Sequence, residues 1–169
     1  MINKKYPDTR LNKYTKLAII AGLIVIIDQI TKAAILHFLP LHESVPVISG
    51  FFSLTHIHNQ GGAFGFLADQ SSVVRGIVFL LISGLAICLI FYFYAKTPKT
   101  HHFLTTGFAF VLGGATGNMI DRIRFGKVVD FLDFFIKELH WPAFNVADSA
   151  ITTGMTIFVI HLLFNKLPE

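Results

Sequence analysis

The sequence has few charged residues and almost no cysteine. Only 14% of its 169 residues are charged, against about 25% in an average soluble domain. The single cysteine, Cys88, gives neither a disulfide framework nor a metal site. By contrast, 53% of the residues are hydrophobic, and Phe alone occurs 18 times. A soluble fold of this length could not bury that much apolar surface, so the composition indicates a membrane protein with one domain, 1–169.

The placement of the basic residues argues against binding of nucleic acid. The formal net charge is +4, but Lys and Arg flank the apolar runs and form no stripe with aromatic residues. Membrane topology explains this distribution better. We therefore expect membrane lipids, and no nucleic acid, as partners.

Four apolar runs are long enough to cross a membrane, at about 17–39, 73–95, 103–120 and 144–164. A helix rising 1.5 Å per residue needs roughly 20 residues to cross about 30 Å of hydrocarbon. The first run is too long for a cleavable signal peptide, and Asp28 and Lys32 interrupt it. The predicted fold class is an all-α integral membrane protein with four transmembrane helices.

Four spans place both termini on the same side of the membrane. Most basic residues fall on that side, namely Lys4, Lys5, Arg10, Lys13, Lys16, Lys96, Lys99 and Lys166. An excess of Lys and Arg marks the cytoplasmic side. We therefore expect a cytoplasmic arm at 1–16, cytoplasmic termini, and outward-facing loops at 40–72 and 121–143.

The first outer loop has its own structural signals. Residues 45–58 are rich in β-branched and aromatic residues with Pro and Gly between them, which predicts short strands. The stretch "NQGGAFGF" at 59–66 follows. Its three glycines within five residues predict a tight backbone path that can approach a ligand closely.

Two aspartates stand where the predicted topology meets the outer interface. Asp130 follows the third span and Asp148 lies just inside the fourth. Two adjacent carboxylates share a proton, so one can deprotonate water while the other donates to a carbonyl oxygen, which is aspartic peptidase chemistry. Alternatively, Asp148 caps a helix and Asp130 is an ordinary loop acid. Asp121 and Asp133 remain rival second acids.

Other polar residues near the spans also allow two interpretations. Asp28 and Lys32 are four residues apart, which favours an ion pair on one helix face, with a proton relay as the alternative. Arg122 either reaches lipid headgroups or orients a substrate main chain. A small transporter or proton-conducting subunit is the competing function, and it depends on Asp28 and Lys32.

The amides and histidines are less decisive. Asn59, Asn118 and Asn145 can cap helices and brace loops, or can together hold a substrate backbone. His56 and His58 would share a face of a strand, but further metal ligands are not evident, so we expect no metal.

Four motifs together carry a family resemblance. They are "DQITK" at 28–32, "NQGGAFGF" at 59–66, "GGATGNMIDRIRFGKVVDF" at 113–131 and "FNVADSAI" at 144–151. Because these motifs occur in this order among four predicted spans, the sequence resembles the bacterial lipoprotein signal peptidases, or signal peptidase II, over most of the chain.

The resemblance implies a membrane aspartic endopeptidase that needs no cofactor. It would cleave the signal peptide from diacylglyceryl-modified prolipoproteins at the lipobox cysteine, with its active site at the outer face of the bacterial inner membrane. It selects Asp130 and Asp148 as the catalytic pair, and it implies a small outer β-element near 42–66. We expect a monomer. Residues that match the family's supporting positions are Asp28, Lys32, Asn59, Gly61, Asn118, Arg122, Asn145 and Ala147.

Overall fold

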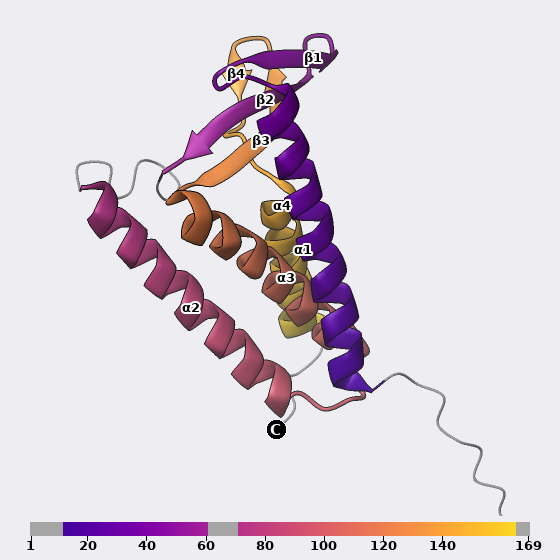
Figure 1. The fold of residues 1–169 in the computed structure, drawn as a ribbon. Helices are drawn as coiled ribbons and strands as arrows, with labels where there is room; N and C mark the ends of the chain where they lie inside the picture. Colours follow the sequence, from indigo (N-terminus) through magenta and orange to yellow (C-terminus); the bar gives the residue numbers. More distant parts are fainter. Residues whose placement is uncertain (1–11, 61–70, 165–169) are drawn as a thin grey trace, which may run out of the picture.

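Four long helices form the body of the protein, and a small sheet covers one end of them (Figure 1). The computed structural model describes residues 12–60 and 71–164. Within these ranges all four helices are long and apolar enough to cross a membrane. They are α1 (Lys13–Phe38), α2 (Ser72–Lys96), α3 (His102–Phe125) and α4 (Val146–Phe164).

The helix ends follow from local capping. The side chain of Asn12 accepts a hydrogen bond from the backbone of Tyr14, so α1 begins inside the predicted arm 1–16. Gly126 ends α3 with a φ of 68°, a left-handed conformation that suits glycine. The predicted third span, 103–120, is therefore too short at its outer end. Asp121 and Arg122 lie on the last turns of α3, not in a loop.

α3 is the central helix. It packs against α1, α2 and α4, and half of its membrane-spanning window is buried, against none of that of α2. Glycines allow this close approach. A Cβ on Gly114 would collide with the carbonyl oxygen of Ala147, and one on Gly117 would lie 2.6 Å from Asp28 Oδ2. The backbone of α3 thus comes close to both helices that carry candidate site residues.

The outer sheet has four antiparallel strands in the order β1-β2-β3-β4. They are β1 (Ser44–Ile48), β2 (Phe52–Asn59), β3 (Val128–Ile136) and β4 (Leu139–His140). The first two agree with the strands predicted in 45–58. No strands were predicted for the outer loop 121–143, and β3 and β4 lie within it. The run "VVDFLDFF" pairs along β2 because its β-branched and aromatic residues suit a strand.

The register of the sheet places Asp130 near the helices. Asp130 pairs with Ile57 across β2 and β3, and the register shifts between Leu54 and Ile57. The first four residues of β3 are all buried. Val129 and Phe131 pack with Ile35 near the outer end of α1. The sheet is thus anchored to the helical body at the strand that carries Asp130.

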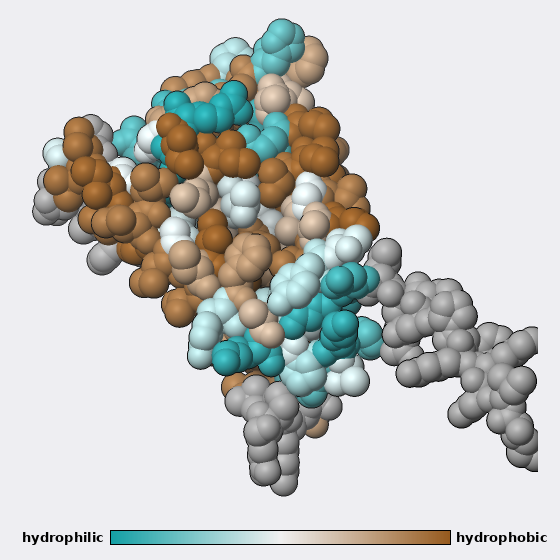
Figure 2. All heavy atoms as spheres, turned by 60° about the horizontal axis from the view of Figure 1, so that its bottom comes forward, coloured by the Kyte–Doolittle hydropathy of each residue, from teal (hydrophilic) through white to brown (hydrophobic). Residues whose placement is uncertain are grey.

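Hydrophobic residues cover most of the helical surface in Figure 2, while hydrophilic residues gather toward the end where α1 begins. Large apolar side chains such as Leu81 and Ile123 are 67% and 64% exposed. Such a surface is costly in water and is typical of helices surrounded by lipid.

Candidate active site

The two candidate catalytic carboxylates come from different kinds of element. Asp130 is the third residue of β3 and is 2% exposed. Asp148 is the third residue of α4 and is half-buried. Asn145 contacts both: its side-chain Nδ2 donates to Asp130 Oδ1 at 2.7 Å, and its backbone N–H donates to Asp148 Oδ2 at 3.2 Å. The fold therefore brings together the pair that the sequence nominated.

Asn145 and Asp148 also form a reciprocal cap at the start of α4. The backbone N–H of Asp148 donates to Asn145 Oδ1 at 2.9 Å, in return for the bond from Asn145 N–H to Asp148 Oδ2. This is the geometry of a capping box, with Asp148 in the reciprocating position. The capping role considered for Asp148 is thus real, and it occupies only one of the two carboxylate oxygens.

Two further amides bind the remaining carboxylate oxygens. Asn59 Nδ2 donates to Asp130 Oδ2 at 3.1 Å, and Asn118 Nδ2 donates to Asp148 Oδ1 at 2.7 Å. All four oxygens of the pair therefore accept a hydrogen bond from an asparagine. The three asparagines form what we call the amide scaffold, and it fixes the orientation of both carboxyl groups.

Lys32 is the centre of a buried charge network behind the amide scaffold. Its Nζ lies 2.9 Å from Asp28 Oδ2, 2.9 Å from Asp121 Oδ2 and 2.9 Å from Asn118 Oδ1. The side chains of Lys32, Asp28 and Asp121 are at most 2% exposed. The predicted ion pair of Asp28 and Lys32 is present. Buried charges of this kind require such complete pairing, because the loss of one partner leaves another charge uncompensated.

Each acid of this network also holds a backbone segment next to the carboxylate pair. Asp28 Oδ1 accepts the N–H of Ala147 at 2.9 Å, which ties α1 to the first turn of α4. Asp121 Oδ2 accepts the N–H of Val129 at 3.1 Å, which ties α3 to the residue before Asp130. The network therefore positions both elements from which the carboxylates project.

The rival acids are engaged elsewhere. Asp121 Oδ1 accepts a bond from Gln29 Nε2 at 2.9 Å, in addition to its contacts with Lys32 and Val129. Asp133 pairs with the exposed His140, at 2.9 Å from its Nδ1, on the β3–β4 hairpin. Among the described acids, Asp130 and Asp148 are the two that the amide scaffold joins.

Two other predicted site residues, Arg122 and Ala147, lie around this centre. Arg122 is half-buried, donates to the carbonyl of Asn118 at 3.3 Å and stacks over the ring of Phe79 at 5.6 Å. Ala147 is completely buried, and its carbonyl packs against Gly114. Gly61 lies outside the described residues.

The environment of Asp130 favours its protonated form. Burial, together with the smaller effect of the nearby charge of Asp148, raises the pKa of Asp130 to about 7. The hydrogen bonds from Asn59 and Asn145 and the charge of Lys32 act in the opposite direction. A carboxyl group with a pKa near neutrality can both give and take a proton at physiological pH.

The two histidines of β2 contact each other, with 3.0 Å between their Nε2 atoms. His56 also bonds through Nδ1 to the carbonyl of Leu39. In the described part of the chain, three or more His, Cys, Asp or Glu side chains do not gather in any arrangement that could hold a metal ion.

Two contributors were missed by the sequence reasoning. Asp121 was considered only as a rival acid, and Gln29 was not considered at all. A signal for Asp121 was available: it follows Asn118 by three residues, so on a helix the two share a face. For Gln29, the motif "DQITK" gave no indication that its amide would reach Asp121 on another helix.

Fold and site together define a membrane-embedded, multi-span protein with a buried carboxylate pair at one end of its helices. Residues 20–164 match the family model described as Signal peptidase (SPase) II. This chain belongs to the signal peptidase II family. It is accordingly a peptidase, and this membership does not support the alternative of a transporter or proton-conducting subunit.

Relatives and solved structures agree with this assignment. The chain is 54% identical over 154 residues to the lipoprotein signal peptidase of Desulforapulum autotrophicum, covering 91% of this chain and 95% of the relative. It is 46% identical over 145 residues to that of Syntrophus aciditrophicus, covering 86% and 90%. A bacterial membrane enzyme solved by the in meso method at 2.3 Å resolution superposes with a TM-score of 0.80 at 33% identity, covering 92% of this chain and 93% of that one.

Proposed function

We propose that this protein is an aspartic endopeptidase that removes signal peptides from prolipoproteins, with Asp130 and Asp148 as its catalytic pair. Family membership and the relatives named lipoprotein signal peptidase support the substrate class. The observation that carries the catalytic assignment is the amide scaffold. Three asparagines bind all four oxygens of two carboxyl groups, and Asn145 contacts both groups.

The proposed reaction uses one proton shared by the pair. Asp148 lies in the first turn of α4, where the helix dipole favours an anion, so we assign it as the base. Asp130, with a pKa raised to about 7, is the acid. Asp148 takes a proton from water as the water oxygen attacks the peptide carbonyl carbon, and Asp130 gives its proton to the carbonyl oxygen.

The intermediate is a neutral tetrahedral diol. Its collapse breaks the carbon–nitrogen bond. Asp148 returns its proton to the departing nitrogen, and Asp130 recovers a proton from a diol hydroxyl. The pair thus ends in its starting protonation state. Since the amide scaffold already fixes both carboxyl groups, little reorganisation is needed during the reaction.

The position of the pair suits a substrate held in lipid. A diacylglyceryl group on the lipobox cysteine would keep its acyl chains in the bilayer and so present the cleavage site at the interface. Much of the entropy of encounter would then be lost before the peptide reaches the carboxylates. Since Lys13, Lys16 and Lys96 lie at the opposite end of the helices, we assign that end to the cytoplasm and the carboxylate pair to the outer face of the bacterial inner membrane.

The test uses purified full-length enzyme and two lipobox peptides that differ only in diacylglyceryl modification. The wild-type protein should cleave the modified peptide strongly and the unmodified one weakly. Asp130→Asn and Asp148→Asn should each abolish cleavage, while Asp133→Asn on the outer hairpin should retain most of it. Near-normal turnover by a folded Asp148→Asn variant would rule out the two-carboxylate mechanism, whatever the substrate.

A further inference from the structure

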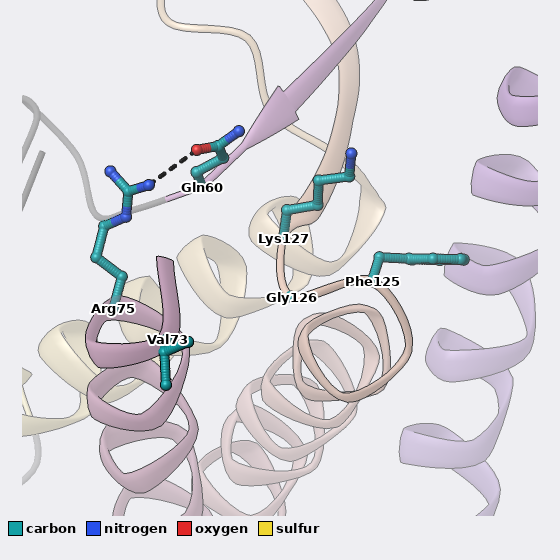
Figure 3. Close-up of a pocket in the computed structure, with 6 residues that line it drawn as sticks. All are labelled: Gln60, Val73, Arg75, Phe125, Gly126 and Lys127. Carbon is teal, nitrogen blue, oxygen red and sulfur yellow. Dashed lines mark hydrogen bonds between the residues drawn. The ribbon is translucent and has the colours of Figure 1, made fainter. Parts of the chain in front are cut away.

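Two hollows of about 380 Å³ each open at the sheet end of the molecule. The one in Figure 3 lies beside the end of β2, where Arg75 donates to Gln60 Oε1 at 3.0 Å and Lys127 lies across from them. The other, which we call the hairpin groove, lies on the β3–β4 hairpin and has His140 as its one polar lining residue. Its apolar lining residues are Phe51, Phe134, Phe135, Ile136, Leu139 and Trp141.

The hairpin groove has a large exposed apolar rim. Leu139, Trp141 and Ile136 are 80%, 69% and 65% exposed. The groove borders the start of β2, since Phe52 pairs with Phe134 there. The undescribed segment 61–70 follows the other end of β2. Large apolar side chains gathered in this way on a surface indicate contact with something other than water.

The geometry of the chain limits how far the groove can lie from the membrane. Phe131 packs with Ile35 in the last turn of α1. Because a strand advances at most about 3.4 Å per residue, Phe134 lies within about 10 Å of the level of Ile35. The N–H of Trp141 donates to the carbonyl of Phe134 at 2.8 Å, so Trp141 lies beside it. The helix itself rises about 4.5 Å from Ile35 to its end at Phe38. The headgroup layer is roughly 5–7 Å thick, so the groove is at its level.

Exposed apolar residues also connect the groove with the lipid-facing surface of α1. Phe38, at the end of this helix, is 79% exposed, and Leu41 is 44% exposed. All five residues of β1 are exposed, and Val47 among them is 54% exposed. Phe51, which follows β1 and lines the groove, is 46% exposed. The apolar surface therefore continues along the chain from a membrane-spanning helix to the hairpin.

The composition of the hairpin matches the boundary between lipid headgroups and acyl chains. Trp is enriched at this boundary, because its ring is apolar and its N–H can bond to polar groups. Lys137 and Glu138 are exposed and make the turn of the hairpin polar. A polar turn beside an aromatic groove suits a bilayer surface, which is already present at this level wherever the helices are inserted.

We propose that the hairpin groove rests on the nearer leaflet of the bilayer, with Trp141 at the boundary between headgroups and acyl chains. This contact is independent of the catalytic assignment. It would give the sheet its own attachment to the membrane, in addition to its packing against α1.

Trp141 makes the contact directly measurable, because it is the only tryptophan in the chain. The full-length protein is reconstituted in phosphatidylcholine vesicles in which the acyl chains are brominated either near the headgroup or near the chain end. Bromine near the headgroup should quench the Trp141 emission strongly, and bromine near the chain end should quench it weakly. Absence of quenching by both lipids would overturn the proposal, as would stronger quenching from the chain end. Exclusion of aqueous iodide without quenching by lipid would indicate a protein partner, such as a second copy, and would also overturn it.

Leu139→Asp tests whether the apolar face of the hairpin makes the contact. Leu139 is 80% exposed, so its replacement removes few contacts within the protein, but a carboxylate is unfavourable against acyl chains. Quenching by bromine near the headgroup should fall, and the Trp141 emission should shift to longer wavelength as the indole enters water. Ile136→Asp, on the same groove, carries the test if Leu139→Asp fails to fold in thermal unfolding.

Lys137→Asp is the matched control. It introduces the same carboxylate into the turn, outside the groove, and Asp tolerates the left-handed φ of 55° that Lys137 has. It should show the quenching of the wild type. Wild-type quenching in folded Leu139→Asp, or an equal loss in Lys137→Asp, would overturn the assignment of the hairpin groove to lipid.

Discussion

Lys32 determines which way the side chain of Asn118 faces. Its Nζ donates to Asn118 Oδ1 at 2.9 Å, so the amide nitrogen of Asn118 points the other way and donates to Asp148 Oδ1 at 2.7 Å. A buried cation on the first helix thus orients a carboxylate on the last helix through one amide. In this way a residue that does not touch Asp148 can still control its position.

We expect Lys32→Met to lower kcat strongly, by about 10²-fold, since small displacements of catalytic groups have costs of that order. It should also lower thermal stability, because Asp28 and Asp121 would be left buried without their cation. Lys16→Met is the control on the same helix, where Lys16 bonds to Thr106 and the carbonyl of His102.

Asn118→Ala should lower kcat without exposing the buried acids. Wild-type kcat in a folded Asn118→Ala variant would show that Asp148 needs no such orientation.

The raised pKa of Asp130 predicts a pH dependence. As pH rises through about 7, Asp130 loses the proton that the proposed acid must donate, so kcat/KM should fall on the alkaline side. The bond from Asn59 lowers this pKa, so Asn59→Ala should move the alkaline limb to higher pH. The profile reports apparent values for the pair. A limb that moved to lower pH in Asn59→Ala would contradict the assignment of the acid.

The same pKa has a consequence for stability. Because it is raised above the ordinary value of 3.8 in the folded protein, folding favours proton uptake at Asp130. Between about pH 4 and 7 the contribution of Asp130 to the free energy of unfolding should therefore fall as pH rises. Above pH 7 this contribution should change no further. Asp130→Asn should flatten this part of the stability profile, as measured by unfolding in detergent. An unchanged slope would show that other groups dominate it.

Close packing of α3 against α4 should depend on Gly114. A side chain there would collide with the carbonyl of Ala147 and approach Ile151. We expect Gly114→Val to destabilise the protein by about 1–3 kcal/mol or more, as overpacking does, and to impair activity because Ala147 lies beside the start of α4. Gly22→Val on α1 is the control, since a Cβ there meets nothing within 4 Å. Equal losses of stability in the two variants would show that helix propensity, not contact, is the cause.

The assigned orientation can be checked by labelling. In a Cys88→Ser background, Lys137→Cys on the outer hairpin should react with a membrane-impermeant maleimide added to intact spheroplasts. Lys99→Cys, in the exposed turn between α2 and α3, should react only after the membrane is opened. The reverse pattern would place the carboxylate pair on the cytoplasmic side.

Much of the architecture was predictable because length and hydropathy decide what can cross a bilayer. All four spans were predicted, although α1 begins before the predicted span 17–39 and α3 ends after the predicted span 103–120. The outer end of α3 was misplaced because Asp121 and Arg122 resemble loop residues when read without the cap at Gly126. Strand β3 was missed for a physical reason. It is buried along its first half and carries two aspartates, so it lacks the alternation that marks a half-exposed strand.

The candidate site was less accessible from the residues alone. Spacing could not choose among Asp121, Asp130 and Asp133 as the partner of Asp148, and it was the family resemblance that selected Asp130. The geometry gives a reason, because Asp121 is bound by Lys32 and Val129 and Asp133 by His140. Contacts such as that of Gln29 with Asp121 join helices distant in sequence, and no local pattern indicates them. The catalytic roles themselves stay a prediction.

The buried network joins α1 to α4. Asp28 and Lys32 belong to α1, while Ala147, which Asp28 binds, lies 119 residues later at the start of α4. A nascent chain that has inserted α1, α2 and α3 but not α4 therefore lacks one of the two proposed catalytic carboxylates and the helix start that Asp28 holds. We expect hydrolytic competence to arise only after α4 is inserted, so that a partly inserted chain would cleave no membrane protein.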